Sequence, residues 1–492
     1  MTRNQIWITV GGVAAALALG IVVTLVVTGG DNTDEISTAG TRPTQPPVTT
    51  TIKPATTPPP TVAPTKPPAT LPPTTPPTVV VVPPTNAPTS PPTVAPTNPV
   101  TAPPTTKPTV PPTTSAPAVD PGITPTEVHL AVIADTQDSI AGVQAWATSV
   151  NAKKSGIGGR KIVLDPFVVN GDPAQFAAAV NTACTQDFAI VGSLSAGDSN
   201  IGNLTTCGIP DLPARALSGA HAGAPNTYAV VPTQSTKQQV GGFRWIKGAV
   251  QGCCKQYVIS SSTNAAAAAA TQLSVDAANS AGVGFTSAGG AKLPDSAPQS
   301  DYTSIVEEME TKGATFGRSD LPFTSTINLR TEAAAQSFTG VKAWFCLAQC
   351  YQPSFVSQGG AHVDGQYVQI GTNPFEDAGS IPAMKKYLSA GGPRNEAGLE
   401  PATAGLLFQT AANQVVAADG KGGLTRAALL AAVAGIDDFN AGGILGLTNV
   451  GGRAPNGCFV MMKVDGGKFV RAEPAGAGQL SCGDQNLLVV GP

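Results

Sequence analysis

Hydrophobic and polar positions alternate between strand-like and helix-like patterns in the middle of the chain. Two apolar, β-branched runs occupy residues 128–133 and 188–194, and each leads into a polar turn that contains glycine or serine. Between them, residues 173–184 repeat apolar side chains at the spacing of a helix. Strands that alternate with helices predict a parallel α/β sheet. Such sheets bind ligands beyond the carboxyl ends of their strands, so we expect residues 134–139 and 193–200 to border a ligand cleft.

A long apolar segment lies near the N-terminus. Residues 6–27 contain no charged side chain and are long enough to cross a bilayer as a helix. Arg3 precedes this segment and Asp31 follows it, and a positive flank stays on the cytoplasmic side. We therefore expect residues 1–30 to form a single-pass anchor in the cell membrane, with the rest of the chain extracytoplasmic. A cleaved signal peptide is the alternative, although no A-x-A cleavage pattern follows the segment.

Proline and threonine dominate the next part of the chain. More than half of the 46 prolines fall between residues 41 and 117, among threonine, alanine and valine, with no helical or strand period. This composition cannot bury enough apolar surface to offset the entropy of ordering. We expect residues 31–120 to form a disordered linker, held extended by proline at about 3.1 Å per residue. The roughly 370 residues that follow suffice for two ordinary cores.

All eight cysteines lie after this linker, which favours disulfides in an oxidising compartment. Three pairs are close along the chain or lie at neighbouring ends of predicted elements: Cys184 with Cys207, Cys346 with Cys350, and Cys458 with Cys482. The pairing of the adjacent Cys253 and Cys254 stays open. Metal binding is the rival interpretation, but no C-x-x-C pair or nearby histidine supports it.

Composition and motifs argue against several functional classes. The net charge is −3 and the basic residues form no block, whereas nucleic-acid binding needs clustered cations. The three histidines lie far apart, and the sequence has no phosphate-binding, dinucleotide-binding or zinc motif. The run GSLSAG at residue 192 resembles a nucleophile elbow but lacks the glycine two places before the serine. We expect neither catalysis nor a cofactor or metal.

Four tracts of the folded part follow one another in an order typical of a known family. They read GITPTEVHLAVIAD from residue 122, VNAKKSGIGGRKIVL from residue 150, DPAQFAAAVNTACTQDFAIVGSLSAGDS from residue 172, and a C-terminal tract that ends in CFVMMKVDGGKFVR. Together they resemble the branched-chain amino-acid-binding (Leu/Ile/Val receptor) family of type I periplasmic solute-binding proteins, the extracytoplasmic receptors of ABC transporters.

The resemblance implies an α/β fold of two parallel-sheet, Rossmann-like lobes joined by three hinge crossovers. Lobe 1 is expected to comprise residues 121–235 and 376–450, and lobe 2 residues 236–375, with residues 451–492 returning to lobe 2 as a hairpin and tail. The strands of lobe 2 are expected near residues 256–261, 282–287, 314–319 and 343–347. A ligand bound between the lobes stabilises their closed arrangement.

The resemblance places the first ligand contacts on lobe 1. The family holds a carboxylate on hydroxyl and backbone N–H groups where a helix begins, because free donors and the helix dipole meet there. The matching loop contains Ser195, Ala196, Gly197 and Asp198. Gly197 allows close approach of the backbone, whereas Asp198 would repel an anion unless it capped the helix. Arg215, in the next loop, is expected to clamp a carboxylate or phosphate, with simple solvation as the alternative.

The remaining contacts implied by the resemblance lie on lobe 2, at Thr263, Asp320, Gln349 and Tyr351. Amino-acid binders of this family carry an acidic residue near the position of Gln349 for the α-ammonium group. Glutamine cannot supply that charge, and Asp320 is the alternative residue that could supply it. The departure disfavours a free α-amino acid and favours a less charged or purely anionic molecule.

The sequence therefore predicts a membrane-anchored, extracytoplasmic solute-binding protein that captures a small polar ligand without chemistry. An amino-acid-like compound, an amide and a small organic acid are the expected ligand classes, for uptake through an ABC permease or for sensing. A cell-surface scaffold with a degenerate cleft is the alternative from another functional class. The long, anchored organisation resembles that of Gram-positive actinobacterial surface receptors.

Overall fold

A computed structural model describes residues 120–153, 156–234 and 236–490 of the chain. The chain divides into two compact units, Met1–Lys107 and Pro108–Pro492, and every described residue belongs to the second. The predicted membrane anchor and nearly all of the predicted linker therefore lie outside the described residues. Within the described ranges, no helix is both long and apolar enough to cross a membrane.

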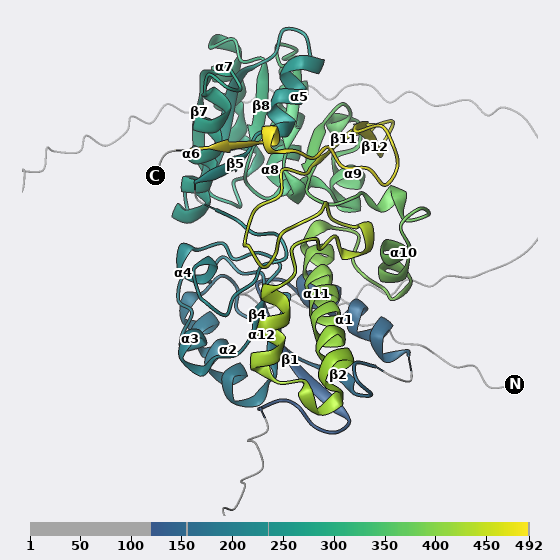
Figure 1. Cartoon of the computed structure of the whole chain (residues 1–492). Helices are drawn as coiled ribbons and strands as arrows, with labels where there is room; N and C mark the ends of the chain where they lie inside the picture. The colour runs from purple at the N-terminus through teal and green to yellow at the C-terminus, as the bar shows by residue number, and fades with distance from the viewer. Residues whose placement is uncertain (1–119, 154–155, 235, 491–492) are drawn as a thin grey trace, which may run out of the picture. The chain divides into compact units, whose positions relative to one another are not determined.

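Lobe 1 contains a parallel sheet of four strands in the order β2-β1-β3-β4 (Figure 1). Its strands are β1 Glu127–Ala134, β2 Lys161–Val168, β3 Ala189–Val191 and β4 Asp211–Leu212. Most residues of β1 are buried, because this strand lies between two others and helices cover both faces of the sheet. The carboxyl ends of the parallel strands meet at one edge, where the loops after β1, β3 and β4 come together.

The helices of lobe 1 lie on both sides of this sheet. α1 (Gln137–Asn151) and α11 (Glu396–Asp419) pack on one face, and α2 (Pro173–Gln186) packs on the other. α1 and α11 approach closely, because a Cβ at Gly142 would lie 1.8 Å from the carbonyl oxygen of Gly398. The other helical segments of this part are α3 Leu204–Cys207, α4 Gly219–Ala222, α10 Pro382–Ser389, α12 Arg426–Ala434, η5 Lys421–Gly423 and η6 Ala441–Gly443.

Lobe 2 contains a sheet of seven strands in the order β12-β11-β10-β9-β8-β6-β7. The parallel strands are β6 Lys255–Ser261, β7 Thr286–Leu293, β8 Phe316–Ser319, β9 Ala343–Cys346 and β10 Tyr367–Ile370. An antiparallel hairpin of β11 (Val460–Asp465) and β12 (Lys468–Glu473) continues the sheet from β10. The helical segments are α5 Gly241–Ala249, α6 Ala265–Asn279, α7 Thr303–Thr311, α8 Phe323–Ala335, α9 Pro353–Gly359, η1 Gln299–Tyr302, η2 Ala348–Cys350 and η3 Gly360–Val363.

One predicted strand of lobe 2 is misplaced. β6, β8 and β9 lie close to their predicted positions, but β7 begins at Thr286 rather than Gly282. Residues before β7 form a turn instead, because the N–H groups of Val283 and Gly284 both donate to the carbonyl oxygen of Ser280. Gly284 has a φ of 76°, in the left-handed region that glycine adopts without strain.

The chain passes between the lobes three times, at residues 231–240, 371–395 and 435–459. The first crossover contains β5 (Lys237–Gln239), which pairs antiparallel with β13 (Leu487–Val489) near the C-terminus (Figure 1). A bridge between Thr372 and Leu445 joins the second and third crossovers. The short segments η4 (Phe375–Asp377) and η7 (Asp484–Asn486) complete the described elements. The C-terminal tail is therefore part of the hinge region.

The described residues contain four disulfides: Cys184–Cys207, Cys253–Cys254, Cys346–Cys350 and Cys458–Cys482. The adjacent pair, whose partners the sequence left open, immediately precedes β6. The last pair ties the segment before β11 to the C-terminal tail. Disulfides of this kind suit the oxidising compartment expected from the cysteine count.

Candidate ligand-binding cleft

A cleft lies between the two lobes, beside the hinge crossovers. One cavity of about 520 Å³ is lined by charged and polar residues of both lobes, which include Arg215, Lys237, Arg318, Asp320, Gln369 and Glu396. A neighbouring cavity of about 680 Å³ shares Arg215, Asp320 and Glu396 with the first. The two cavities therefore form one cleft with room for a small molecule.

Arg215 and two glutamates form the lobe 1 wall of the cleft. The loop after β4 presents Arg215, whose Nε donates to Glu400 Oε2 at 2.7 Å and whose Nη2 also binds Glu400. Asn395 caps α11 by accepting the Gly398 N–H at 2.9 Å. This cap places Glu396 in the first turn of the helix and Glu400 one turn later, so both carboxylates face Arg215.

Glu396 is the less completely paired of these two glutamates. Its side chain is 7% exposed, its Oε2 lies 3.8 Å from Arg215 Nη2, and its Oε1 accepts the Gly371 N–H at 2.9 Å. Burial and the nearby Glu400 carboxylate raise the pKa of Glu396 to about 7, although Arg215 and the Gly371 N–H oppose the rise. The cleft thus contains a carboxyl group that changes its charge near neutral pH.

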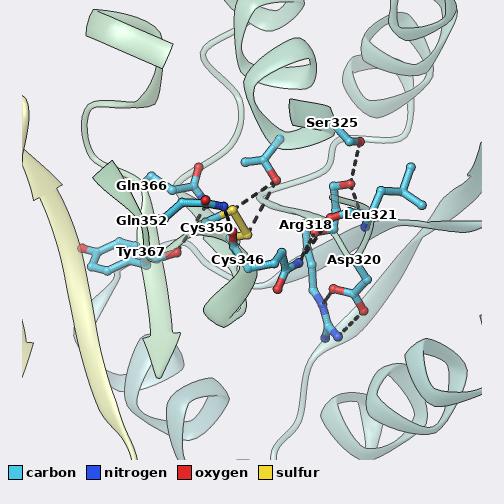
Figure 2. The surroundings of a disulfide bond; sticks show 12 residues. Arg318, Asp320, Leu321, Ser325, Cys346, Cys350, Gln352, Gln366 and Tyr367 are labelled. Carbon is cyan, nitrogen blue, oxygen red and sulfur yellow. Dashed lines mark hydrogen bonds and ion pairs between the residues drawn. A yellow bond between two sulfur atoms is a disulfide. The ribbon is translucent and has the colours of Figure 1, made fainter. Parts of the chain in front are cut away.

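Arg318 and Asp320 form a second charge pair on the lobe 2 wall. Arg318 lies in β8 and is almost fully buried, and its Nε donates to Asp320 Oδ1 at 2.5 Å (Figure 2). Its Nη1 donates to Ser274 Oγ at 3.0 Å. The guanidinium lies 5.4 Å from the ring centroid of Phe243 and 5.8 Å from that of Phe345, within the range of cation–π attraction. Asp320 and the rings thus compensate the charge of Arg318 within lobe 2.

The loop that sequence reasoning assigned to a ligand carboxylate binds a carboxylate of the chain itself. Asp135, which follows β1, accepts the Gly171 N–H and the Ser195 hydroxyl on Oδ1, and the Ala196 N–H on Oδ2, each at 2.7 Å. Ser195 Oγ in turn accepts the Gly197 N–H at 3.0 Å. The loop begins no helix, and the next helical segment is the four-residue α3. The donors expected to hold a ligand are therefore occupied by Asp135.

Asp198 belongs to a buried ion network rather than to the cleft or to a helix cap. It accepts the N–H groups of Leu217 and Ser218, and its Oδ2 lies 2.9 Å from His221 Nδ1. Asp211 Oδ2 lies 2.6 Å from His221 Nε2 on the other side of the ring. Burial alone would lower the pKa of His221, but the charge of Asp211 and the hydrogen bonds to both aspartates raise it to about 10. As a histidinium, His221 donates from both ring nitrogens and fixes the loop that contains Arg215.

The remaining predicted contacts separate into three groups. Gln349 lines both cavities of the cleft, and its Nε2 makes only long contacts of 3.4 Å with the carbonyl oxygens of Ser319 and Leu321. Ala196 and Thr263 border a third cavity of about 630 Å³. Ser195, Gly197, Asp198 and Tyr351 line none of these three cavities. Tyr351 is buried at 2% exposure, and its hydroxyl binds Glu376 and accepts the Phe375 N–H, so it points away from the cleft.

Sequence reasoning missed several residues that line the cleft: Lys237, Arg318, Gln369, Glu396 and Glu400. A signal for the last two was present, since Asn395 is a good N-cap and the glutamates lie four residues apart on one helix face. No comparable pattern marks the others, whose positions depend on the hinge and on strand order. In the described part of the chain, no cluster of three or more His, Cys, Asp or Glu side chains is placed to hold a metal ion.

Comparisons with known proteins agree with this architecture. A family model described as periplasmic binding protein matches residues 132–468. No curated protein matches the sequence. A fatty acid ABC transporter substrate-binding protein from Thermomonospora curvata is 16% identical with a TM-score of 0.61, and the match covers 75% of this chain and 96% of that one.

Two further solved structures extend the comparison. The branched-chain amino acid transporter substrate-binding protein LivJ from Streptococcus pneumoniae, in complex with isoleucine, is 15% identical with a TM-score of 0.57, covering 73% of this chain and 100% of that one. A solute-binding protein from R. palustris, in complex with 4-hydroxybenzoate, is 15% identical with a TM-score of 0.55, covering 70% and 96%. At these identities the likeness shows the fold, while the family model covers well over half of the sequence. The chain therefore belongs to the type I periplasmic binding proteins, the family that includes the branched-chain amino-acid-binding proteins of ABC transporters.

Proposed function

We propose that this chain is a membrane-anchored, extracytoplasmic receptor that captures a small polar ligand between its lobes, for ABC-type uptake or for sensing. The observation that carries the proposal is the cleft, whose opposite walls present charged groups from lobe 1 (Arg215 and Glu396) and lobe 2 (Asp320). A ligand that bridges these groups would favour the closed arrangement of the lobes. Members of this family bind solutes for transporters and are not enzymes, so capture is non-covalent.

The proposed ligand classes are amino-acid-like compounds, amides and small organic acids, and the charged lining of the cleft supports a polar ligand. The similar structures include proteins whose titles refer to isoleucine, a fatty acid and 4-hydroxybenzoate. None of these ligands transfers to this chain at about one-sixth identity. The charged groups of the cleft favour a polar molecule over a fatty acid, because a long apolar tail would remove water from those groups without offering them a hydrogen bond.

Anchoring rests on the N-terminal sequence. The uncharged residues 6–27 are long enough to span a bilayer, and the proline-rich residues 31–120 would hold the binding domain away from the membrane. Such a tether allows the lobes to meet an ABC permease in the same membrane. It also suits a sensor that works without a transporter.

Thermal unfolding tests the receptor function. The full-length chain in detergent is refolded to remove carried-over ligand, and its unfolding is followed by tryptophan fluorescence against a panel of amino acids, amides, sugars and small acids. A ligand at 100 times its dissociation constant stabilises the fold by about 2.7 kcal/mol, which is a shift of several degrees. A shift for one chemical class supports the proposal.

A surface scaffold with a degenerate cleft is the second candidate, and one observation favours it. The donors of the Ser195 loop are occupied by Asp135, so the carboxylate site that the resemblance implied is filled from within. The absence of any shift across the panel would favour the scaffold over the receptor.

A further inference from the structure

The charges of the cleft are unevenly paired. Arg215 makes two hydrogen bonds to Glu400, and Arg318 makes two to Asp320. Both guanidinium groups are thus held by internal carboxylates in the two-point geometry that would otherwise hold a ligand anion. An anionic ligand would have to displace one of these carboxylates to bind either guanidinium at two points.

The Ser195 loop offers an anion no better place. Asp135 accepts three donors at 2.7 Å, two from the backbone and one from the Ser195 hydroxyl. A carboxylate accepting several short hydrogen bonds is stabilised in its charged form. A ligand carboxylate that approached this loop would meet both occupied donors and a like charge.

Glu396 stands in contrast to these closed pairs. Glu396 as a whole residue is 6% exposed, and it lines both cavities of the cleft. Its Oε2 accepts no hydrogen bond from the described residues, and Arg215 Nη2 lies 3.8 Å away, beyond hydrogen-bonding distance. A carboxylate oxygen at the wall of a cleft that accepts no hydrogen bond from the protein is available to a ligand that brings a donor.

We propose that the cleft selects a small cationic amine, whose N–H groups donate to Glu396, and that Asp135 excludes carboxylate ligands by occupying the Ser195 loop. This inference rests on the receptor function proposed above, specifies the charge of its ligand, and removes small organic acids from the ligand classes named there. An ammonium group bound to Glu396 would supply the donor that Glu396 Oε2 lacks. It would also balance a carboxylate of the cleft that no guanidinium binds at two points.

Isothermal titration calorimetry on the full-length chain in detergent tests the proposal. The probes are small aliphatic amines, and carboxylic acids with the same carbon skeletons. We expect wild-type protein to bind amines and not the matched acids. Glu396→Gln keeps the shape and can still accept the Gly371 N–H, but it lacks the charge, so amine affinity should fall at least tenfold. Glu307→Gln, on the exposed side of α7, is the matched control and should bind as wild type does.

Asp135→Ala tests the exclusion of carboxylates by a gain of binding. The substitution frees three donors, so the variant should bind a short carboxylate such as butyrate at least tenfold more tightly than wild type. Far-UV circular dichroism and thermal unfolding verify that each variant is folded. Unchanged butyrate affinity in a folded Asp135→Ala variant would contradict the role of Asp135.

Two results separate this inference from the receptor function. The charge selection is overturned if wild type binds a carboxylic acid as tightly as the matched amine, or if Glu396→Gln binds amines as wild type does. Either result leaves the receptor function intact. Both proposals are overturned if wild type binds none of these probes and none of the compounds in the thermal-shift panel.

Discussion

The buried His221 network gives a stability prediction that does not depend on the ligand. His221→Asn removes a histidinium whose side chain is 2% exposed and which lies 2.9 Å from Asp198 and 2.6 Å from Asp211. The variant leaves two buried carboxylates without their shared cation. Breaking a buried ion pair by removing one partner costs about 3–5 kcal/mol. The rise of the His221 pKa from 6.5 to about 10 corresponds to roughly 5 kcal/mol, which is the same scale.

The pH dependence of this difference follows from the direction of the pKa shift. The folded-state pKa of His221 is raised, so its contribution is fully present below about pH 6.5 and is lost as the pH rises through about 10. The stability difference between wild type and His221→Asn should therefore be largest at pH 6 and shrink toward pH 10. For a folded part of roughly 370 residues, 3–5 kcal/mol corresponds to about 4–6 °C in Tm at pH 6.

Urea and thermal unfolding at several pH values measure this difference. His129→Asn is the matched control, because His129 lies 3.1 Å from Asp165 but its side chain is 32% exposed. An exposed pair of this kind contributes less than about 1 kcal/mol. The reasoning is refuted if His221→Asn unfolds within about 1 kcal/mol of wild type at pH 6, or if the difference grows as the pH rises.

Three further predictions concern other parts of the molecule. Arg426→Met removes the donors to the carbonyl oxygens of residues 184, 187 and 188, so it should destabilise lobe 1 by about 2–4 kcal/mol in urea unfolding, and a change below about 1 kcal/mol would contradict this. Replacing Cys458 and Cys482 by serine should cost about 3 kcal/mol and raise hydrogen exchange in β13, whereas unaltered exchange there would argue against a hinge role for the tail. Amine binding should tighten as the pH rises through about 7, because the raised pKa of Glu396 leaves its carboxyl group neutral at lower pH and a cation prefers the ionised form. Calorimetry at pH 5.5 and 8 checks this, and weaker amine binding at pH 8 would contradict it.

Much of the fold was predictable from local patterns. Residues 128–133 and 188–194 are mostly apolar runs, as expected of parallel strands covered on both faces; the first lies within β1 and the second contains β3. The start of β7 was not predictable in this way, because glycine at residues 282 and 284 permits a turn that the hydrophobic pattern does not reveal. The pairing of the vicinal Cys253 and Cys254 was likewise open, since adjacency in sequence neither requires nor forbids a bond.

The cleft was predictable only where it follows directly from the ends of strands. Arg215 and Asp320, which the family resemblance implied, come just after β4 and β8 and line the cleft, as expected of residues beyond the carboxyl ends of parallel strands. Tyr351 follows β9 by the same rule, yet its ring turns into the core and its hydroxyl binds Glu376. Strand ends therefore locate the loops, but packing between loops decides which side chains of each loop face the ligand.

The charge of the ligand is the property that loop sequence predicts least well. Ser195, Ala196 and Gly197 have the composition of an anion-binding loop, and on their own they favour an acid as ligand. Their actual partner, Asp135, lies 60 residues before Ser195, at the end of β1. Because β1 and β3 are parallel neighbours, their carboxyl ends bring this acid and these donors to the same point. A loop of donors in this fold thus indicates an anionic ligand only when the neighbouring strand supplies no carboxylate of its own, so strand order has to be known before the ligand's charge can be inferred.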